Sequence, residues 1–185
     1  ELNKDQAKIL ALRWNDYGIA LLGQSLYGQA SEAFRKASEI FPEEENFLVN
    51  TAIAEIKTER FGPELSQLKK AKILLEKALF INSENKRAKF HLALINRSQG
   101  KTQEATEVLL QLAKDFPNDR ELQRELGQSF YRIGKFDEAK RAFLEVNRVD
   151  PTNIVAFQFL TSLFAREGLL KESEIFQQKY LLWRD

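Results

Sequence analysis

The segment Tyr131–Pro151, with the sequence YRIGKFDEAKRAFLEVNRVDP, decides the fold because it recurs elsewhere in the chain. Four of its positions match four earlier ones at a constant interval: Ala30, Phe34, Ala37 and Pro42 reappear as Ala139, Phe143, Val146 and Pro151, and Gly18 reappears as Gly127. A third copy, at Ala105, Leu109, Leu112 and Pro117, precedes the last by about 34 residues, the period of a helix-turn-helix array. Such arrays build one extended surface, which favours partner binding over catalysis.

The composition fits one folded unit without a strong overall charge. The chain has 185 residues, of which 43% are apolar and 30% charged, and single domains commonly reach roughly 200 residues. Lys and Arg together number 28 against 27 for Asp and Glu, so no global positive field draws the chain to nucleic acid. No apolar run approaches the roughly 20 residues that a membrane-spanning helix needs. We therefore expect neither nucleic-acid binding nor membrane insertion.

The chain has no cysteine and a single histidine, two side chains on which many catalytic and metal sites depend. The absence of cysteine excludes disulfides, thiolate metal ligands, a cysteine nucleophile and haem attachment through C-x-x-C-H within this sequence. His91 is the only histidine, so no paired-histidine metal site can form. We expect no enzymatic activity, no cofactor and no metal. Methionine is absent even at position 1, so we expect the natural chain to extend upstream of Glu1.

Aligning the copies gives five units, each predicted to contain two helices, and thus ten helices in a single domain over residues 1–185. The units lie near residues 11–44, 45–85, 86–119, 120–153 and 154–185. Within units, Gly100, Gly134 and Gly168 mark the turn between helices, with Gly28 as a looser counterpart. The second unit carries about seven extra residues, which we place near Thr58–Glu64.

The ends of the units carry stop and start signals. Phe41-Pro42, Phe116-Pro117 and Asp150-Pro151 end the second helix of a unit, because proline disfavours helical geometry in the residue before it. Asn118-Asp119 and Thr152-Asn153 then supply side-chain oxygens that can cap the next helix. In the second unit, a further helix is predicted through Leu68, Ala71, Leu75 and Ala78.

The pattern of large and small residues resembles the tetratricopeptide repeat family over nearly the whole chain. The first unit matches through Trp14, Tyr17, Gly18, Leu21, Ala30, Phe34, Ala37 and Pro42, and the fourth through Leu126, Gly127, Phe130, Ala139, Phe143 and Pro151. The resemblance implies an all-α fold, a right-handed α-solenoid of about five repeats. It also implies a non-catalytic module that binds or assembles proteins.

A narrower resemblance involves the stretch Arg13–Ile19, the order of the repeats and the ending near Tyr180–Asp185. These features are similar to the C-terminal tetratricopeptide region of bacterial multihaem c-type cytochromes. That resemblance implies an alternative function, an accessory domain in extracytoplasmic electron transfer with the haems upstream of this segment. It also implies a periplasmic location in a bacterium.

In the tetratricopeptide family the first helix of each repeat lines a concave groove, which implies a set of partner-binding residues here. The set is Asn15, Ile19, Leu22, Val49, Asn50, Ile53, Arg87, Phe90, His91, Leu94, Arg97, Arg124, Gln128, Tyr131, Arg132, Gln158 and Arg166. Its early members are mostly apolar, and its later members combine arginines with aromatic and amide groups, a mixture typical of interface anchors. We expect a protein or peptide segment with apolar side chains at one end and acidic groups at the other.

Two alternatives to this groove stay open from the sequence. The apolar half could pack against an upstream segment while the arginines form solvated pairs with Glu121 and Glu125. The leucines and tryptophan of Leu181–Trp183 could dock on the last repeat or on another chain, so self-association is also open. The carboxylate clamp of some family members is incomplete, since only Asn50 and Arg87 match it and His91 replaces its arginine.

Overall fold

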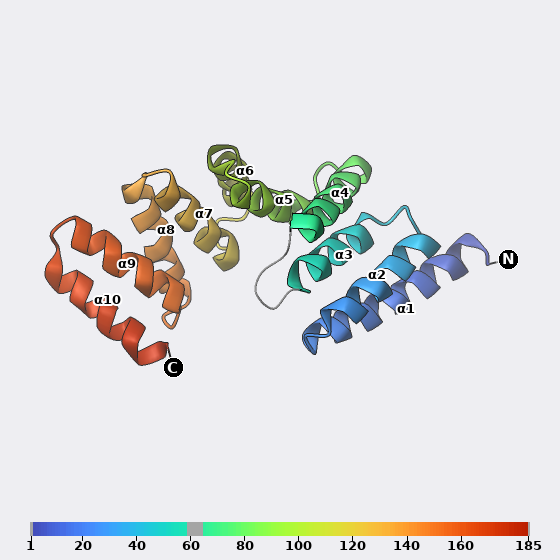
Figure 1. Ribbon diagram of the computed structural model, residues 1–185, viewed down its shortest axis with the longest axis horizontal. Coiled ribbons are helices and arrows are strands. Elements are labelled where there is room, and N and C mark those ends of the chain that lie inside the picture. The colour runs from blue at the N-terminus through green and yellow to red at the C-terminus, as the bar shows by residue number, and fades with distance from the viewer. Residues whose placement is uncertain (1, 59–64, 185) are drawn as a thin grey trace. The chain divides into compact units, whose positions relative to one another are not determined.

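A computed structural model describes residues 2–58 and 65–184, and these residues form ten helices and no strand (Figure 1). The all-α prediction is confirmed. The helices are α1 (Lys4–Gly23), α2 (Tyr27–Ile40), α3 (Glu45–Lys57), α4 (Leu65–Ile81), α5 (Lys86–Ser98), α6 (Thr102–Asp115), α7 (Arg120–Arg132), α8 (Phe136–Val149), α9 (Ile154–Arg166) and α10 (Leu170–Trp183).

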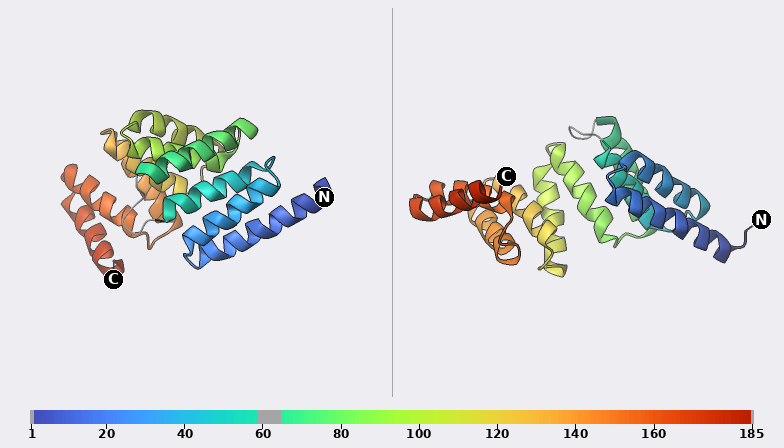
Figure 2. Two further views of the ribbon diagram at one scale, coloured as in Figure 1. Left: turned by 45° about the vertical axis from the view of Figure 1, so that its right-hand side comes forward. Right: turned by 90° about the horizontal axis from the view of Figure 1, so that it is seen from below.

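The chain divides into two compact units, Glu1–Ile95 and Asn96–Asp185, with the boundary inside α5. In the first unit α1 lies along α2 and α3 along α4; in the second, α7 lies along α8 and α9 along α10 (Figures 1 and 2). Each unit is therefore built from pairs of neighbouring helices. A single domain over the whole chain stays a prediction.

The helix starts follow the repeat period except at the first helix. The helices α3, α5, α7 and α9 begin at the residues where the repeat alignment places unit starts. The first helix begins earlier, at Lys4 instead of near Ala11, because Asn3 and Gln6 form a capping box. The Asn3 side chain accepts from the Gln6 amide at 2.9 Å, and the Gln6 side chain accepts from the Asn3 amide at 3.0 Å.

Glycine was predicted at four of the turns inside repeats, and at three of them it has the left-handed backbone conformation. Gly100, Gly134 and Gly168 have φ values of 87°, 79° and 76°. The prediction for Gly28 is wrong, because Gly28 lies within α2 and the left-handed residue of that turn is Ser25, with φ of 60°. Glycine has no Cβ to clash in this conformation, whereas serine is strained in it.

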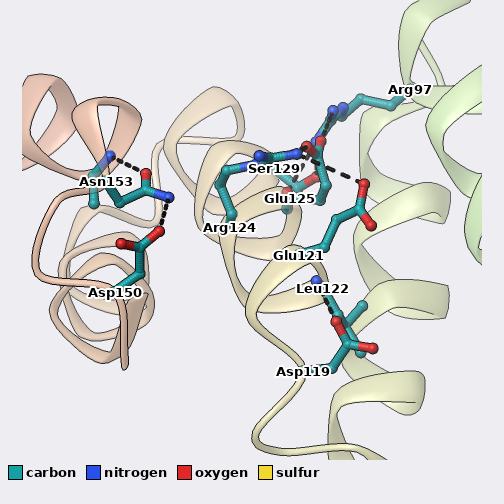
Figure 3. Close-up of polar contacts among 10 residues, drawn as sticks. Arg97, Asp119, Glu121, Leu122, Arg124, Glu125, Ser129, Asp150 and Asn153 are labelled. Carbon is teal, nitrogen blue, oxygen red and sulfur yellow. Dashed lines mark hydrogen bonds and ion pairs between the residues drawn. The ribbon is translucent and has the colours of Figure 1, made fainter. Parts of the chain in front are cut away.

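The predicted helix caps are present in the second unit. The Asp119 side chain accepts from the Leu122 amide at 3.1 Å, and the Asn153 side chain accepts from the Ala156 amide at 3.0 Å (Figure 3). Asn85 caps α5 in the same way, accepting from the Ala88 amide at 3.0 Å. Side-chain caps therefore start α5, α7 and α9, whereas Glu44 at the start of α3 forms none, and the cap at Asn85 was not anticipated from the sequence.

Small residues face aromatic rings in both units, as the repeat pattern predicts. Gly18 on α1 lies against the ring of Phe34 on α2, and Gly127 on α7 lies against the ring of Phe143 on α8. Both rings are completely buried, as is Ala139, whose burial the predicted helix contacts require. A close helix crossing without a Cβ at the contact thus repeats at equivalent positions.

The predicted helix in the second repeat is α4, whose Ala71, Leu75 and Ala78 are completely buried. These side chains share a core cluster with Val49 and Ala52 of α3. The insertion predicted near Thr58–Glu64 lies mostly outside the described residues. At the other end of the chain, Leu182 and Trp183 on α10 stay 74% and 52% exposed.

Candidate partner-binding surface

In the first unit, three predicted groove residues form a hydrogen-bonded chain across α1, α3 and α5. The Arg87 guanidinium donates to Asn50 Oδ1 at 2.7 Å, and Asn50 Nδ2 donates to Asn15 Oδ1 at 2.7 Å. Partial desolvation lowers the pKa of Arg87 below its ordinary value, but an arginine stays charged at neutral pH. Asn15 is the last residue of this series of hydrogen bonds and is only half-buried, so its side-chain NH2 group can donate to a partner.

The apolar groove residues of this unit differ sharply in exposure. Ile19 is 52% exposed and Leu22 is half-buried, so both can contact a partner. Val49 is completely buried against Ala71 and Leu75 of α4, and its predicted place in the groove is wrong. The packing of α3 on α4 fills the position that the repeat alignment leaves open.

Four further residues of the first unit contribute little apolar surface. Ile53 and Phe90 are each only 9% exposed. His91 and Leu94 are half-buried, and the His91 ring lies edge-on to the Phe90 ring with centroids 5.2 Å apart. The expected apolar half of the surface therefore reduces to Ile19 and Leu22, with edges of the four others.

In the second unit, Arg97 is held in a buried ion pair and is withdrawn from any partner (Figure 3). Its guanidinium pairs with the Glu125 carboxylate and also donates to the Glu125 carbonyl oxygen at 2.8 Å and to Ser129 Oγ at 3.0 Å. The side chains of Arg97 and Glu125 are only 11% and 10% exposed. The prediction that Arg97 binds a partner is wrong, because the next repeat supplies its carboxylate internally.

Arg124 is partly occupied by the same carboxylate. Its guanidinium donates to Glu125 Oε1 at 2.9 and 3.2 Å and lies 3.8 Å from Glu121 (Figure 3). The ion pairs expected with Glu121 and Glu125 are thus present, but the Glu125 side chain is buried, whereas that of Arg124 is partly exposed. Glu125 therefore binds two arginines, Arg97 from the end of α5 and Arg124 from its own helix α7.

Three predicted residues on α7 and α9 are accessible and unpaired among the described residues: Gln128 is half-buried, and Arg132 and Gln158 are exposed. Arg166, which occupies the same position on α9 as Arg132 on α7, lies over the Phe136 ring at 3.8 Å and makes no ion pair with a described residue. The Tyr131 hydroxyl lies 3.0 Å from Ser162 Oγ, and its ring packs edge-on against Phe136 and Phe159. The accessible groups of this face are therefore mainly hydrogen-bond donors.

The sequence did not indicate Ser129, Phe136 and Phe159 as members of this surface. Ser129 is completely buried, and Phe136 and Phe159 are half-buried rings that position Tyr131 and Arg166. None of the three lies at a groove position of the repeat, so the period carries no signal for them.

The described residues contain neither a cluster of metal-binding side chains nor a membrane-spanning helix. In residues 2–58 and 65–184 no three His, Cys, Asp or Glu side chains gather in a way that could hold a metal ion. No helix of the same residues is both long and apolar enough to cross a membrane.

Residues 96–154 match the family model of the tetratricopeptide repeat. The match covers the segment from the end of α5 to the start of α9. The solved structure of PilF from Pseudomonas aeruginosa is 20% identical, with a TM-score of 0.80 over 95% of this chain and 77% of PilF. MamA from Desulfovibrio magneticus RS-1 is 16% identical, with a TM-score of 0.73 over 94% of both chains.

A third similar structure is YrrB, a tetratricopeptide repeat protein with an unusual peptide-binding site, which is 20% identical with a TM-score of 0.67 over 92% of this chain and 84% of YrrB. At these identities the likeness shows the fold, a helical repeat solenoid. No curated protein matches the sequence. The cytochrome alternative and the periplasmic location are not tested by these matches and stay predictions.

Proposed function

We propose that this chain is a non-catalytic protein-binding module, and that the first helices of its repeats bind an acidic segment of a partner protein. The observation that carries the proposal is the pair Arg132 and Arg166. Both guanidiniums occupy the same repeat position, and neither forms an ion pair with a described residue. Exposed arginines without a carboxylate can donate hydrogen bonds to the carboxylates of an acidic partner.

The donors of α7 and α9 repeat in register. Arg124, Gln128 and Arg132 lie along α7, and Gln158, Ser162 and Arg166 occupy the same positions along α9. A partner segment that crosses these helices therefore meets a similar set of donors on each. Of the two acids beside these donors on α7, Glu121 is exposed, and the Glu125 carboxylate is already paired with Arg97.

The first unit supplies contacts of a different kind. Ile19 offers exposed apolar surface, and Asn15 ends a chain of amide hydrogen bonds that fixes its orientation. Fixed side-chain amides bind main-chain groups of an extended segment without regard to its side chains. This unit is therefore suited to hold a partner backbone beside an apolar residue.

The test starts from a random library of 16-residue peptides selected on the immobilised chain. Dissociation constants of the enriched peptides are then measured by fluorescence anisotropy for the wild type and for Arg132→Glu/Arg166→Glu. Exposed ion pairs contribute about 0.2–1 kcal/mol each, so losing two and adding repulsion should weaken acidic peptides about tenfold or more.

The matched control reverses two exposed lysines on second helices of the same unit, Lys114→Glu/Lys171→Glu. This variant carries the same change in net charge, and it should bind the selected peptides as the wild type does. Enriched peptides that lack acidic residues, or that bind the double arginine variant with unchanged affinity, contradict the proposal.

A further inference from the structure

The solvent-facing side of α4 carries large apolar side chains between lysines. Phe80 is 93% exposed, Ile73 is 53% exposed and Ile81 is 43% exposed. Lys69, Lys70 and Lys77 lie on the same side of the helix and are exposed, whereas Ala71, Leu75 and Ala78 on the opposite side are completely buried. We call the six exposed residues the α4 face. It belongs to the second helix of its repeat, whereas the surface proposed above consists of first helices.

The charge of the α4 face is not neutralised within the described residues. Lys69, Lys70 and Lys77 form no ion pair or hydrogen bond with any described residue. The acid on this side, Glu76, lies 3.9 Å from Lys72, which is not one of the three. Three unpaired cations beside three exposed apolar side chains complement an acidic, amphipathic partner.

A cleft of about 360 Å³ opens beside the α4 face, between α2, α3 and α4. Ile73 and Leu74 form the apolar wall of the cleft. Lys70 and Arg35 are its basic residues, and α3 contributes Thr51 and Glu55 to its lining. The Ser31 hydroxyl donates to Glu55 Oε1 at 2.5 Å, so the acid of the cleft is satisfied internally. The volume is sufficient for a large apolar side chain of a partner.

The spacing of the anchors selects a helical partner. Ile73 and Phe80 are seven residues apart on one helix, which places them two turns or about 10.5 Å apart along its axis. Apolar residues in register on a second helix would lie over them as in helix pairs with a seven-residue repeat. Acidic residues that flank those positions would reach the lysines.

We propose that the α4 face docks an acidic amphipathic helix of another protein, with one apolar side chain in the cleft beside Ile73. The cleft favours a protein over an anionic lipid surface, because a protein can insert one apolar side chain into the cleft and a bilayer surface has no such side chain. The carboxylates of Glu32 and Glu39, which hold Arg35 at the cleft, also oppose an anionic bilayer. The chain would then bind one partner through first helices and a second through α4.

The experiment selects a random 16-residue peptide library on the variant Arg132→Glu/Arg166→Glu, in which the surface proposed above is disabled. We expect enriched peptides that are acidic, have apolar residues in a helical spacing and gain helical circular dichroism when bound. Phe80→Ala should weaken them at least tenfold, and so should Lys69→Glu/Lys70→Glu/Lys77→Glu. Because Phe80 is almost fully exposed, its truncation leaves the fold intact.

Two controls match these variants elsewhere in the chain. Leu170→Ala removes an apolar side chain that is 70% exposed on α10, and Lys114→Glu/Lys135→Glu/Lys171→Glu reverses three exposed lysines. Both should leave the affinity of the selected peptides unchanged. Loss of binding in these controls as well would show general electrostatic attraction and overturn the proposal.

Other occupants of the α4 face give different results. Wild-type chain that sediments with vesicles of 3:1 phosphatidylcholine and phosphatidylglycerol, in a manner abolished by Phe80→Ala, identifies a lipid surface and overturns the proposal. A concentration-dependent dimer in analytical ultracentrifugation that Phe80→Ala dissolves identifies a second copy and also overturns it. A selection that yields no peptide whose binding depends on Phe80 also overturns the proposal for the α4 face. This holds whether or not Arg132 and Arg166 are found to bind acidic peptides.

Discussion

Substituting Gly18 by alanine should destabilise the chain, although alanine is the better helix former. A Cβ built on Gly18 would lie 2.5, 2.7 and 2.9 Å from three atoms of the Phe34 ring. Carbon atoms in contact prefer a separation of about 3.5–4.0 Å, so ring and helix would have to separate by about 1 Å. The Phe34 ring is completely buried and has no free space in which to move.

The magnitude follows from two opposing effects. Overpacking a core costs about 1–3 kcal/mol, and replacing a helical glycine by alanine returns up to about 1 kcal/mol. We expect Gly18→Ala to lose about 1–2 kcal/mol and about 3–6 °C in melting temperature for a chain of this size. Gly127→Ala should be close to neutral, because its Cβ would lie 3.0–3.2 Å from the Phe143 ring and needs a smaller shift.

Urea denaturation followed by far-ultraviolet circular dichroism measures both variants. Gly23→Ala is the matched control, since Gly23 also lies in α1 and its Cβ would meet no atom within 4 Å. That variant should be as stable as the wild type or slightly more stable. Gly18→Ala combined with Phe34→Leu should show a favourable coupling of about 1 kcal/mol, because a smaller side chain relieves the overlap. A Gly18→Ala variant as stable as Gly23→Ala would refute the reasoning.

Three further outcomes follow from the described contacts. Arg97→Met should cost about 2–3 kcal/mol in urea denaturation, because it leaves the buried Glu125 with Arg124 alone, and Arg97→Met/Glu125→Leu should recover part of that loss. Gly134→Ala should cost about 1–2 kcal/mol despite open space around it, because φ is 79° there, and equal stability would show that the turn rearranges. The pKa of Asp150 lies below 3.8 because Asn153 and Thr152 donate hydrogen bonds to its carboxylate, with Arg120 assisting. The contribution of Asp150 to stability is therefore present above pH 3.8 and is lost as the pH falls through the lowered pKa. The variant Asp150→Asn should be less stable than the wild type at about pH 7 and equally stable near pH 2. Denaturation midpoints at several pH values measure this difference.

The helix boundaries were the most predictable part of the fold, because local chemistry sets them. Gly134 and Gly168 end helices through a backbone conformation that few other residues adopt at low cost, and Asp119 and Asn153 start helices through their own side chains. Where local chemistry was ambiguous the prediction was wrong, as for Gly28, whose turn instead uses Ser25.

The candidate site was predictable by position but not by availability. The repeat period correctly places Arg132 and Gln158 on accessible helix faces, yet it gives Val49 and Arg97 the same status. Val49 is covered by α4, and Arg97 is taken by Glu125 and Ser129. Which residue of a neighbouring repeat stands opposite a side chain depends on packing between repeats, and the period alone carries no information about it.

The sequence by itself determined that this chain is a helical repeat, because small and large residues recurring at a fixed interval leave only a stack of helix pairs in which each ring meets a residue small enough to admit it. Only the tertiary structure decided which charges remain for a partner. A guanidinium such as that of Arg97 is neutralised when the next repeat brings a carboxylate within hydrogen-bond distance, and one such as that of Arg132 stays unpaired among the described residues when it does not.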